Sequence, residues 1–381
     1  SDEDGGLLQR LHRHLSSSRI QLRGKPVDVI PGSPAPQEYG RRGSREALAA
    51  SPNARAESSV MSEPEPQAFA ADPAMRASPL RASRSKEQVP VGDYPLAMSG
   101  LSRSMQDFVV VSEIGRGAYG LVKKVKLRRA DGQPQGKDYV IKLIIKSRIL
   151  ADCWRRHRVL GPIPVEIHVM DQLRRLPYDP PAEAAPWSPH KLFPGTPAMS
   201  ATTAVEESPA AHPNLAQMLD FFEDHEFYYL VMPCFGKGQD LFDFVESAPD
   251  GLDARHVRCI CGQVAGGLRY LHANNIVHRD IKDENVILDG RGHAQIIDFG
   301  SAAHIKPGRL FDTFSGTLDY AAAEILQGEK YSGKPQDIWA LGVVLYVMMC
   351  GECPFWNGEE AVAGLAEGTR AKTALEERCM L

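Results

Sequence analysis

A short polar segment in the second half of the chain constrains its fold and chemistry more than any other feature. Residues 278–288 read His-Arg-Asp-Ile-Lys-Asp-Glu-Asn-Val-Ile-Leu, and ten residues further on comes the triplet 298–300, Asp-Phe-Gly, after two isoleucines. A chance occurrence of both patterns at this separation is remote. The pair therefore indicates one shared chemical task.

The residue types in the two segments fit the transfer of a phosphoryl group. That reaction needs little covalent help from a protein, but it needs an oriented nucleophile and cations on the phosphates. Asp280 can accept the hydrogen bond and finally the proton of a hydroxyl, and Lys282 can neutralise charge on the moving phosphoryl group. Asn285 and Asp298 supply oxygen ligands of the kind that Mg²⁺ prefers. We therefore expect Asp280 and Lys282 to be catalytic and Asn285 and Asp298 to hold Mg²⁺.

A glycine-rich segment earlier in the chain predicts a phosphate-binding turn. Residues 115–122 read Gly-Arg-Gly-Ala-Tyr-Gly-Leu-Val, and glycines let backbone N–H groups approach phosphate oxygens closely. The same glycine spacing opens dinucleotide-binding folds, but there the third glycine begins a helix. Here residues 121–127 alternate apolar and basic side chains, so the glycines lie in a hairpin between strands. A dinucleotide-dependent oxidoreductase is nearly excluded, and the sequence has no GxxxxGK[ST] motif of a Walker-type site.

A lysine within an apolar strand follows the hairpin. Lys142 lies in the run 139–145, Tyr-Val-Ile-Lys-Leu-Ile-Ile, and a buried lysine must have its charge compensated. The helix predicted over 165–173 carries Glu166 between apolar neighbours, which makes it a natural partner. The alternative, a lysine that reaches out of an edge strand into solvent, stays open from this pattern alone.

Two long stretches are rich in Pro, Ala and Ser and show no sustained period. Residues 1–104 cannot bury enough apolar area to offset their ordering entropy, so we predict disorder there. Residues 177–213 interrupt an ordered pattern and are interpreted as a disordered surface insertion. The remaining patterns place a β-rich unit with one helix, 105–232, before a mainly helical unit, 233–356. This order predicts an α+β fold with two lobes.

Composition excludes several classes of partner. A net charge of −4 gives no reason to expect nucleic acid or an anionic membrane, and no apolar run is long enough to span a bilayer. The seven cysteines are odd in number and scattered, which favours buried thiols in a reducing compartment over disulfides or a metal site. We expect a cytoplasmic or nuclear protein.

From about residue 107 to residue 356 the chain resembles the protein kinase superfamily, and in particular the PAS kinases of fungi within the calcium/calmodulin-kinase-like group. Besides the segments above, the resemblance rests on 107–115, 147–154, 297–303 and 334–342. It implies a bilobal fold with a small antiparallel sheet and a mainly helical second lobe. It also implies a serine/threonine kinase that uses ATP and Mg²⁺, acts on protein substrates and serves nutrient or metabolic signalling. No segment resembles a PAS sensor domain.

The resemblance assigns ATP contacts residue by residue. Lys142 would contact the α- and β-phosphates while paired with Glu166, and Met232 would be the gatekeeper. The other residues implied to contact ATP are Gly115, Arg116, Gly117, Ala118, Tyr119, Gly120 and Leu121 in the flap, Ile114, Val122, Ile287 and Ile297 around the adenine, and Cys234 in the hinge.

Further roles follow from the same resemblance. Thr317 would hydrogen-bond the catalytic aspartate, and Asp337 would hold the backbone of the catalytic loop. Thr313 and Ser315 are candidate phosphorylation sites, because Arg279 offers a guanidinium to a phosphate. The carboxylates Asp240 and Asp243 either meet the ribose and basic residues of a peptide substrate or simply begin a solvated helix.

The sequence departs from the family pattern in two places. Residues 322–324 read Ala-Ala-Glu where relatives carry Ala-Pro-Glu, and residues 357–381 do not resemble the helices that complete the second lobe. We therefore expect that lobe to be incomplete. The alternative to an active kinase is a truncated, catalytically impaired homologue that binds nucleotide or a partner.

Overall fold

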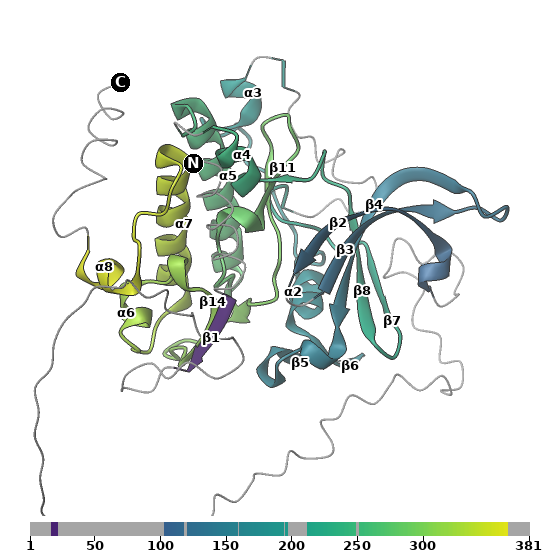
Figure 1. Ribbon diagram of the computed structural model, residues 1–381, viewed down its shortest axis with the longest axis horizontal. Helices are drawn as coiled ribbons and strands as arrows, with labels where there is room; N and C mark the ends of the chain where they lie inside the picture. The colour runs from purple at the N-terminus through teal and green to yellow at the C-terminus, as the bar shows by residue number, and fades with distance from the viewer. Residues whose placement is uncertain are drawn as a thin grey trace, which may run out of the picture. The chain divides into compact units, whose positions relative to one another are not determined.

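The computed structural model describes residues 17–21, 103–117, 120–158, 160–193, 195–196, 212–248 and 251–364. Five antiparallel strands form its largest sheet, in the order β2-β3-β4-β8-β7. The strands are β2 (Phe108–Gly117), β3 (Gly120–Arg128), β4 (Pro134–Ile145), β7 (Asp220–Glu223) and β8 (Phe227–Pro233). Helices dominate the chain after β8, so the predicted α+β fold class is confirmed (Figure 1).

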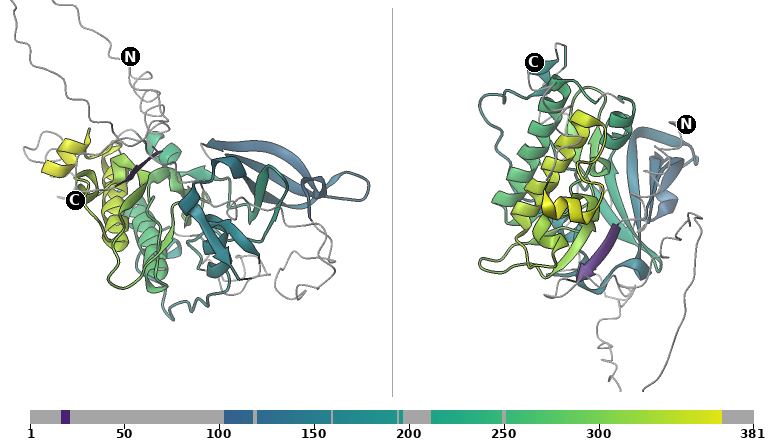
Figure 2. Two further views of the ribbon diagram at one scale, coloured as in Figure 1. Left: turned by 90° about the horizontal axis from the view of Figure 1, so that it is seen from below. Right: turned by 60° about the vertical axis from the view of Figure 1, so that its left-hand side comes forward.

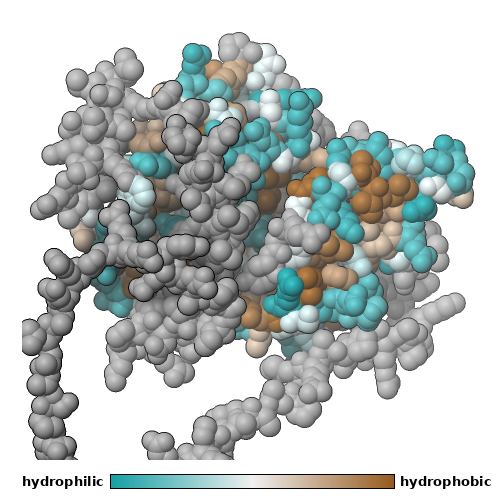
Figure 3. All heavy atoms as spheres, viewed as in Figure 1, coloured by the Kyte–Doolittle hydropathy of each residue, from teal (hydrophilic) through white to brown (hydrophobic). Residues whose placement is uncertain are grey.

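The alternation of side chains along β4 separates two environments. Ile141 and Leu143 are buried with Val125 of β3 on one face of the sheet, whereas Ile144 joins the core on the other face. Lys142 shares the face of Ile144. On β2 the exposed apolar residues are Val110, Val111 and Ile114, and Figure 3 shows apolar side chains over this part of the sheet.

Helix α2 (Val165–Leu173) covers the face of the sheet that carries Lys142. Pro164 precedes it in an extended conformation, and seven of its nine residues are buried, Glu166 among them. Ile167, Val169 and Met170 pack in the same core as Ile144. The helix therefore has the bounds that the apolar spacing predicts, whereas the hairpin before it, β5 (Trp154–His157) and β6 (Gly161–Pro164), was not predicted.

Two long helices carry the second half of the chain. They are α5 (Ala254–Ala273), which Asp253 caps, and α7 (Gly333–Cys350), which ends at Gly351 with a positive φ of 75°. Both contribute to the largest apolar core, with Leu268 and Val344 fully buried. The shorter helices are α3 (Pro189–Leu192), α4 (Leu241–Glu246), α6 (Ala323–Leu326) and α8 (Gly358–Ala363).

Short strands and single 3₁₀ turns hold the loops on these helices. The strands are β9 (Gln239–Asp240), β11 (Val286–Leu288) and β12 (Ala294–Ile296) in one sheet, and β10 (Ile276–Val277) paired with β13 (Ala303–His304). The 3₁₀ turns are η2 (Met105–Asp107), η3 (Lys146–Arg148), η4 (Ala151–Cys153), η5 (Asp283–Asn285) and η6 (Leu318–Tyr320).

The segment interpreted as an insertion, 177–213, contains helix α3 close to α5. A Cβ placed on Gly262 of α5 would lie 2.1 Å from the ring of Trp187, so the glycine is required by this contact. Residues 194 and 197–211 lie outside the described residues.

Strand β1 (Ser17–Gln21) pairs antiparallel with β14 (Thr313–Thr317), far along the chain. Figures 1 and 2 show β1, in purple, beside the helical half of the molecule. It falls in the stretch 1–104 for which we predicted disorder, and the rest of that stretch up to 102 lies outside the described residues. Within the described part, no helix is long and apolar enough to cross a membrane.

Candidate active site

Lys142 lies between two carboxylates. Its Nζ is 2.8 Å from Oε1 of Glu166 and 2.9 Å from Oδ1 of Asp298. The pairing of Lys142 with Val122 on β3 and Leu230 on β8 fixes its place in the middle of the sheet. The alternative of a lysine that reaches into solvent from an edge strand is therefore wrong.

Charge compensation decides the protonation of this cluster. Burial opposes the charged form of Lys142, but the carboxylates of Asp298 and Glu166 outweigh it and raise the pKa of the lysine. Burial likewise opposes ionisation of Asp298, yet Lys142 and the N–H of Gly300 lower its pKa to about 2. Burial raises the pKa of Glu166 to about 7, an effect that Lys142 only partly offsets. Of the two carboxylates, Asp298 therefore favours the charged form more strongly than Glu166.

Asp280 is held by Thr317 at the end of β14 and by Asn285 in the turn that follows Asp280 in the chain. The N–H and Oγ1 of Thr317 each lie 3.0 Å from its Oδ1. Asn285 donates through Nδ2 to the carbonyl oxygen of Asp280 at 2.8 Å and to its Oδ2 at 3.3 Å. Lys282 pairs with Glu284 at 2.7 Å. These contacts bring the expected catalytic residues together.

The environment of Asp280 favours a stronger base than a free aspartate. Burial raises its pKa, and the charges of Lys282 and His278 partly offset the rise. Burial disfavours the charge of Lys282, but Asp280 and Glu284 outweigh it and raise the pKa of the lysine. The charges of Asp280 and Lys282 therefore influence each other, although the ion pair of Lys282 is with Glu284.

A buried aspartate from α7 fixes the catalytic loop. Oδ2 of Asp337 accepts the N–H of His278 at 3.0 Å and lies 2.7 Å from Nε2 of His272, while Oδ1 accepts the N–H of Arg279 at 2.7 Å. The predicted role of Asp337 is confirmed. Arg279 has a positive φ of 66°, which is uncommon for a residue other than glycine and needs such support.

The donor set around Asp298 fits Mg²⁺. Asn285 uses its amide nitrogen on Asp280, which leaves its carbonyl oxygen for a cation, and Asp298 is a charged carboxylate. Mg²⁺ in phosphate-binding sites typically takes one or two protein carboxylates and receives its other ligands from phosphates and water. In the described part of the chain no cluster of three or more His, Cys, Asp or Glu could bind a metal without such help.

A cavity of about 70 Å³ joins the two halves of this constellation. Lys142, Glu166, Asp280, Asp298 and Ser315 all line it. Lys142 and Asp298 therefore face the same space, as a shared ligand requires.

The glycine-rich hairpin has the predicted form at the residues that are described. Gly115 pairs with Val122, Arg116 with Leu121 and Gly117 with Gly120, while Ala118 and Tyr119 lie outside the described residues. A Cβ on Gly120 would lie 1.6 Å from the carbonyl oxygen of Leu143, so this position accepts no side chain.

The remaining adenine positions lie on the strands around the site. Met232 belongs to β8 and Cys234 follows it, Ile287 belongs to β11, and Ile297 follows β12. Their contact with adenine stays a prediction. Asp240 caps α4 by accepting the N–H of Asp243 at 2.7 Å, and burial raises its pKa to about 6.

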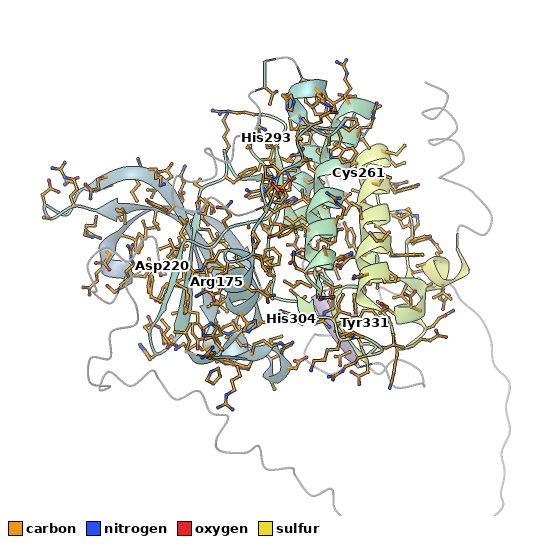
Figure 4. The ribbon with its side chains drawn as sticks, turned by 180° about the vertical axis from the view of Figure 1, so that it is seen from behind. Arg175, Asp220, Cys261, His293, His304 and Tyr331 are labelled. Atoms are coloured by element: carbon orange, nitrogen blue, oxygen red, sulfur yellow. The ribbon has the colours of Figure 1, made fainter. Side chains whose placement is uncertain are left out.

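The two candidate phosphorylation sites lie on β14 beside Arg279. The Nη1 atom of Arg279 is 3.4 Å from the carbonyl oxygen of Thr313, and Tyr331, labelled in Figure 4, donates to the same oxygen at 3.3 Å. Ser315 lies 3.2 Å from the hydroxyl of Ser301. Thr313 and Arg279 also line a cavity of about 540 Å³ with the basic residues Arg155, His304, Lys306 and Arg309.

Sequence reasoning missed the residues that act by supporting others. His272 and Tyr331 contact the loops above from distant elements, and no local spacing marks them. His278 was placed in the motif but given no role, although its ring lies 5.3 Å from that of Phe299 and 3.0 Å from the carbonyl oxygen of Ile297. This contact joins the two decisive segments.

A two-layered sheet-and-helix unit, a strand lysine paired with a helix glutamate, and an aspartate loop opposite Asp-Phe-Gly define a protein kinase domain. Residues 202–376 match the family described as the protein kinase domain, so the chain carries a protein kinase domain. Among curated proteins, it is similar to serine/threonine-protein kinase PSK1 of Saccharomyces cerevisiae, with 39% identity over 277 residues, 72% of this chain and 17% of that protein.

Two further relatives extend this similarity. Serine/threonine-protein kinase ppk6 of Schizosaccharomyces pombe is 39% identical over 257 residues, 68% of this chain and 28% of that protein. The PAS domain-containing serine/threonine-protein kinase of Mus musculus is 32% identical over 287 residues, 74% and 17% of the two chains. The chain thus matches only 17 to 28% of the length of these relatives. The resemblance to PAS kinases is confirmed.

Proposed function

We propose that the chain is an active serine/threonine protein kinase, which transfers the γ-phosphoryl group of Mg·ATP to a hydroxyl of a protein substrate. The observation that carries this proposal is the position of Asp280. Thr317 and Asn285 hold it at the cavity that Lys142 and Asp298 also line. A base and a cation-binding carboxylate at one cavity are what in-line phosphoryl transfer requires.

In the proposed mechanism, the chain's own residues position reactants and handle one proton. Lys142, oriented by Glu166, binds the nonreacting phosphates, while Asp298 and Asn285 would hold Mg²⁺, which would neutralise phosphate charge. Asp280 accepts the hydrogen bond of the acceptor hydroxyl and then its proton. Lys282, close to Asp280, stabilises negative charge on the phosphoryl group in transit.

Phosphorylation of Thr313 is the proposed means of regulation. The cavity beside Thr313 brings together the side chains of Arg155, Arg279, Lys306 and Arg309, and like charges at such a site favour a bound anion. Burial and, to a lesser extent, the charge of Arg279 lower the pKa of Arg155. We expect a phosphate at Thr313 to order this segment and raise activity. Equal activities of Thr313→Ala and the unchanged chain, after preincubation with Mg·ATP, would contradict it.

The catalytic proposal is tested with the purified chain, Mg·[γ-³²P]ATP and a serine peptide with basic residues before the acceptor. Label transfer should fall at least about 100-fold in Asp280→Ala. A matched control, Asp131→Ala, changes an exposed aspartate in the turn between β3 and β4, which does not line the cavity, and should keep activity. Label transfer by the unchanged chain no greater than that of Asp280→Ala would refute the kinase proposal. ATP binding measured in the same samples would then leave the non-catalytic, nucleotide-binding homologue.

A further inference from the structure

Strand β14 has two edges: one faces the loop that carries Asp280, and the other pairs with β1. On the inner side, its Thr313 carbonyl oxygen accepts from Arg279 and Tyr331, and Thr317 donates to Asp280. On the outer side, β1 pairs with all five residues of β14, and no other described strand joins this two-stranded sheet. The right-hand view of Figure 2 shows β1 in purple beside the helical half. The outer edge of β14 therefore accepts an extended chain through backbone hydrogen bonds.

The register places a serine next to the catalytic loop. Ser17 lies opposite Thr317, Ser18 opposite Gly316 and Arg19 opposite Ser315. Opposed residues of an antiparallel pair have Cα atoms about 4.5–5.5 Å apart, and Thr317 itself is 3.0 Å from the carboxylate of Asp280. Of the five residues in β1, Ser17 is the one paired with the residue that touches Asp280.

We propose that β1 is an acceptor substrate within the same chain and that Ser17 is its phosphorylation site. This inference rests on the proposed kinase activity. The oxygen of the Ser17 hydroxyl forms a bond to the γ-phosphorus of ATP, the bond from that phosphorus to the β–γ bridging oxygen breaks, and ADP leaves. The hydroxyl proton passes to Asp280. The product is phosphoserine at position 17.

Backbone pairing and tethering both favour this acceptor. A segment that adds to an exposed strand edge binds mainly through main-chain hydrogen bonds, which any extended segment can form. Such a segment can act as an acceptor when it carries a hydroxyl residue at the right register. Residues 22–102 connect β1 to the rest of the chain, so the encounter of β1 with β14 is intramolecular and needs no second molecule. Because β1 occupies the outer edge, an external peptide that binds there must displace it.

The first experiment follows autophosphorylation of the full chain. The chain is incubated with Mg·[γ-³²P]ATP at protein concentrations tenfold apart, with the basic serine peptide as a reference for activity, and labelled residues are identified by mass spectrometry. We expect phosphate on Ser17 with a rate constant independent of protein concentration. Ser17→Ala should abolish label at 16–18, whereas Ser51→Ala, a serine elsewhere in the amino-terminal stretch, should leave it unchanged. Label confined to other residues while the peptide is phosphorylated would overturn the proposal.

The second experiment tests the pairing without catalysis. Alternate residues of an antiparallel strand point their N–H groups at the partner, so the double variant Arg19→Pro/Ile20→Pro must remove at least one bond to β14. Amide hydrogen exchange over 313–317 should become about tenfold faster than in the unchanged chain, and labelling of Ser17 should fall at least tenfold. Unchanged exchange would overturn the pairing. Faster exchange in a chain that labels neither itself nor the peptide would instead overturn the kinase proposal, and with it the acceptor role.

Discussion

The hydrogen bonds of Asp337 give the most quantitative test of how the catalytic loop is held. Its carboxylate accepts two backbone N–H groups, from His278 and Arg279, and lies 2.7 Å from the ring nitrogen of His272. The side chain is completely buried. In Asp337→Asn, the amide oxygen can keep the place of Oδ2 beside His278 and His272, while the new NH₂ group takes the place of Oδ1 and faces the N–H of Arg279.

The magnitude follows from these contacts. A hydrogen bond to a charged group contributes about 1.5–3 kcal/mol, and a buried donor without a partner costs about 1–3 kcal/mol. If Asp337→Asn loses one of these hydrogen bonds and keeps the geometry of the other, its free energy of unfolding should decrease by about 2–4 kcal/mol. Against a total of about 5–15 kcal/mol for a domain, this change is readily measured.

Urea unfolding followed by tryptophan fluorescence measures the change as a shift in midpoint at unchanged slope. The control Glu329→Gln removes an exposed carboxylate from the loop before α7 and should stay within about 0.5 kcal/mol of the unchanged chain. Peptide phosphorylation by Asp337→Asn should also fall, because the loop that carries Asp280 is less well fixed. A decrease in unfolding free energy of under about 1 kcal/mol would refute the assignment of Asp337 as the support of this loop.

Three further predictions concern charge and backbone. Lys142→Met should reduce peptide phosphorylation at least about 100-fold in steady-state assays, since the phosphates lose their cation, and a smaller loss would argue against its role. Lys282→Met should raise the pKa of Asp280 further, because the lysine offsets the effect of burial. As Asp280 must be ionised to act, the acid limb of the kcat/KM profile should then move to higher pH, and a move to lower pH would contradict this. Ala323→Pro should raise the free energy of unfolding by about 0.4–1 kcal/mol, because Ala323 is the first residue of α6, whereas Ala321→Pro should lower it by removing an N–H that donates to Leu318.

The elements predicted from the sequence are those whose contacts repeat along one segment. The alternation over 121–127 predicted strand β3, and the apolar spacing over 165–173 predicted helix α2 with its observed bounds. In each case one face of the element packs on a core, so burial leaves a period in the sequence.

The elements that were missed depend on partners distant in the chain. Strand β14 carries Gly316 and three hydroxyl residues, and its conformation depends on contacts with Arg279, Asp280 and β1. No periodicity records such contacts. The same holds for the hairpin β5–β6, whose strands are short and include arginines and prolines. Motif spacing nevertheless predicted side chains that line one cavity, because their identities follow from chemistry, while the residues that support them follow from packing.

The strained residues show why the site needs that packing. In the described part of the chain, the residues other than glycine with positive φ are Asn275, Arg279 and Asp298, and the last two belong to the decisive segments. A left-handed conformation costs such a residue about 1–2 kcal/mol, so each must be held by other contacts. Asp337 holds Arg279 through its N–H, and Lys142 holds Asp298 through its carboxylate. One support comes from α7 and the other from β4, so both halves of the domain must be folded before the two strained residues are both in place. The catalytic geometry is therefore a property of the assembled domain, and neither the aspartate loop nor the Asp-Phe-Gly segment can specify it alone.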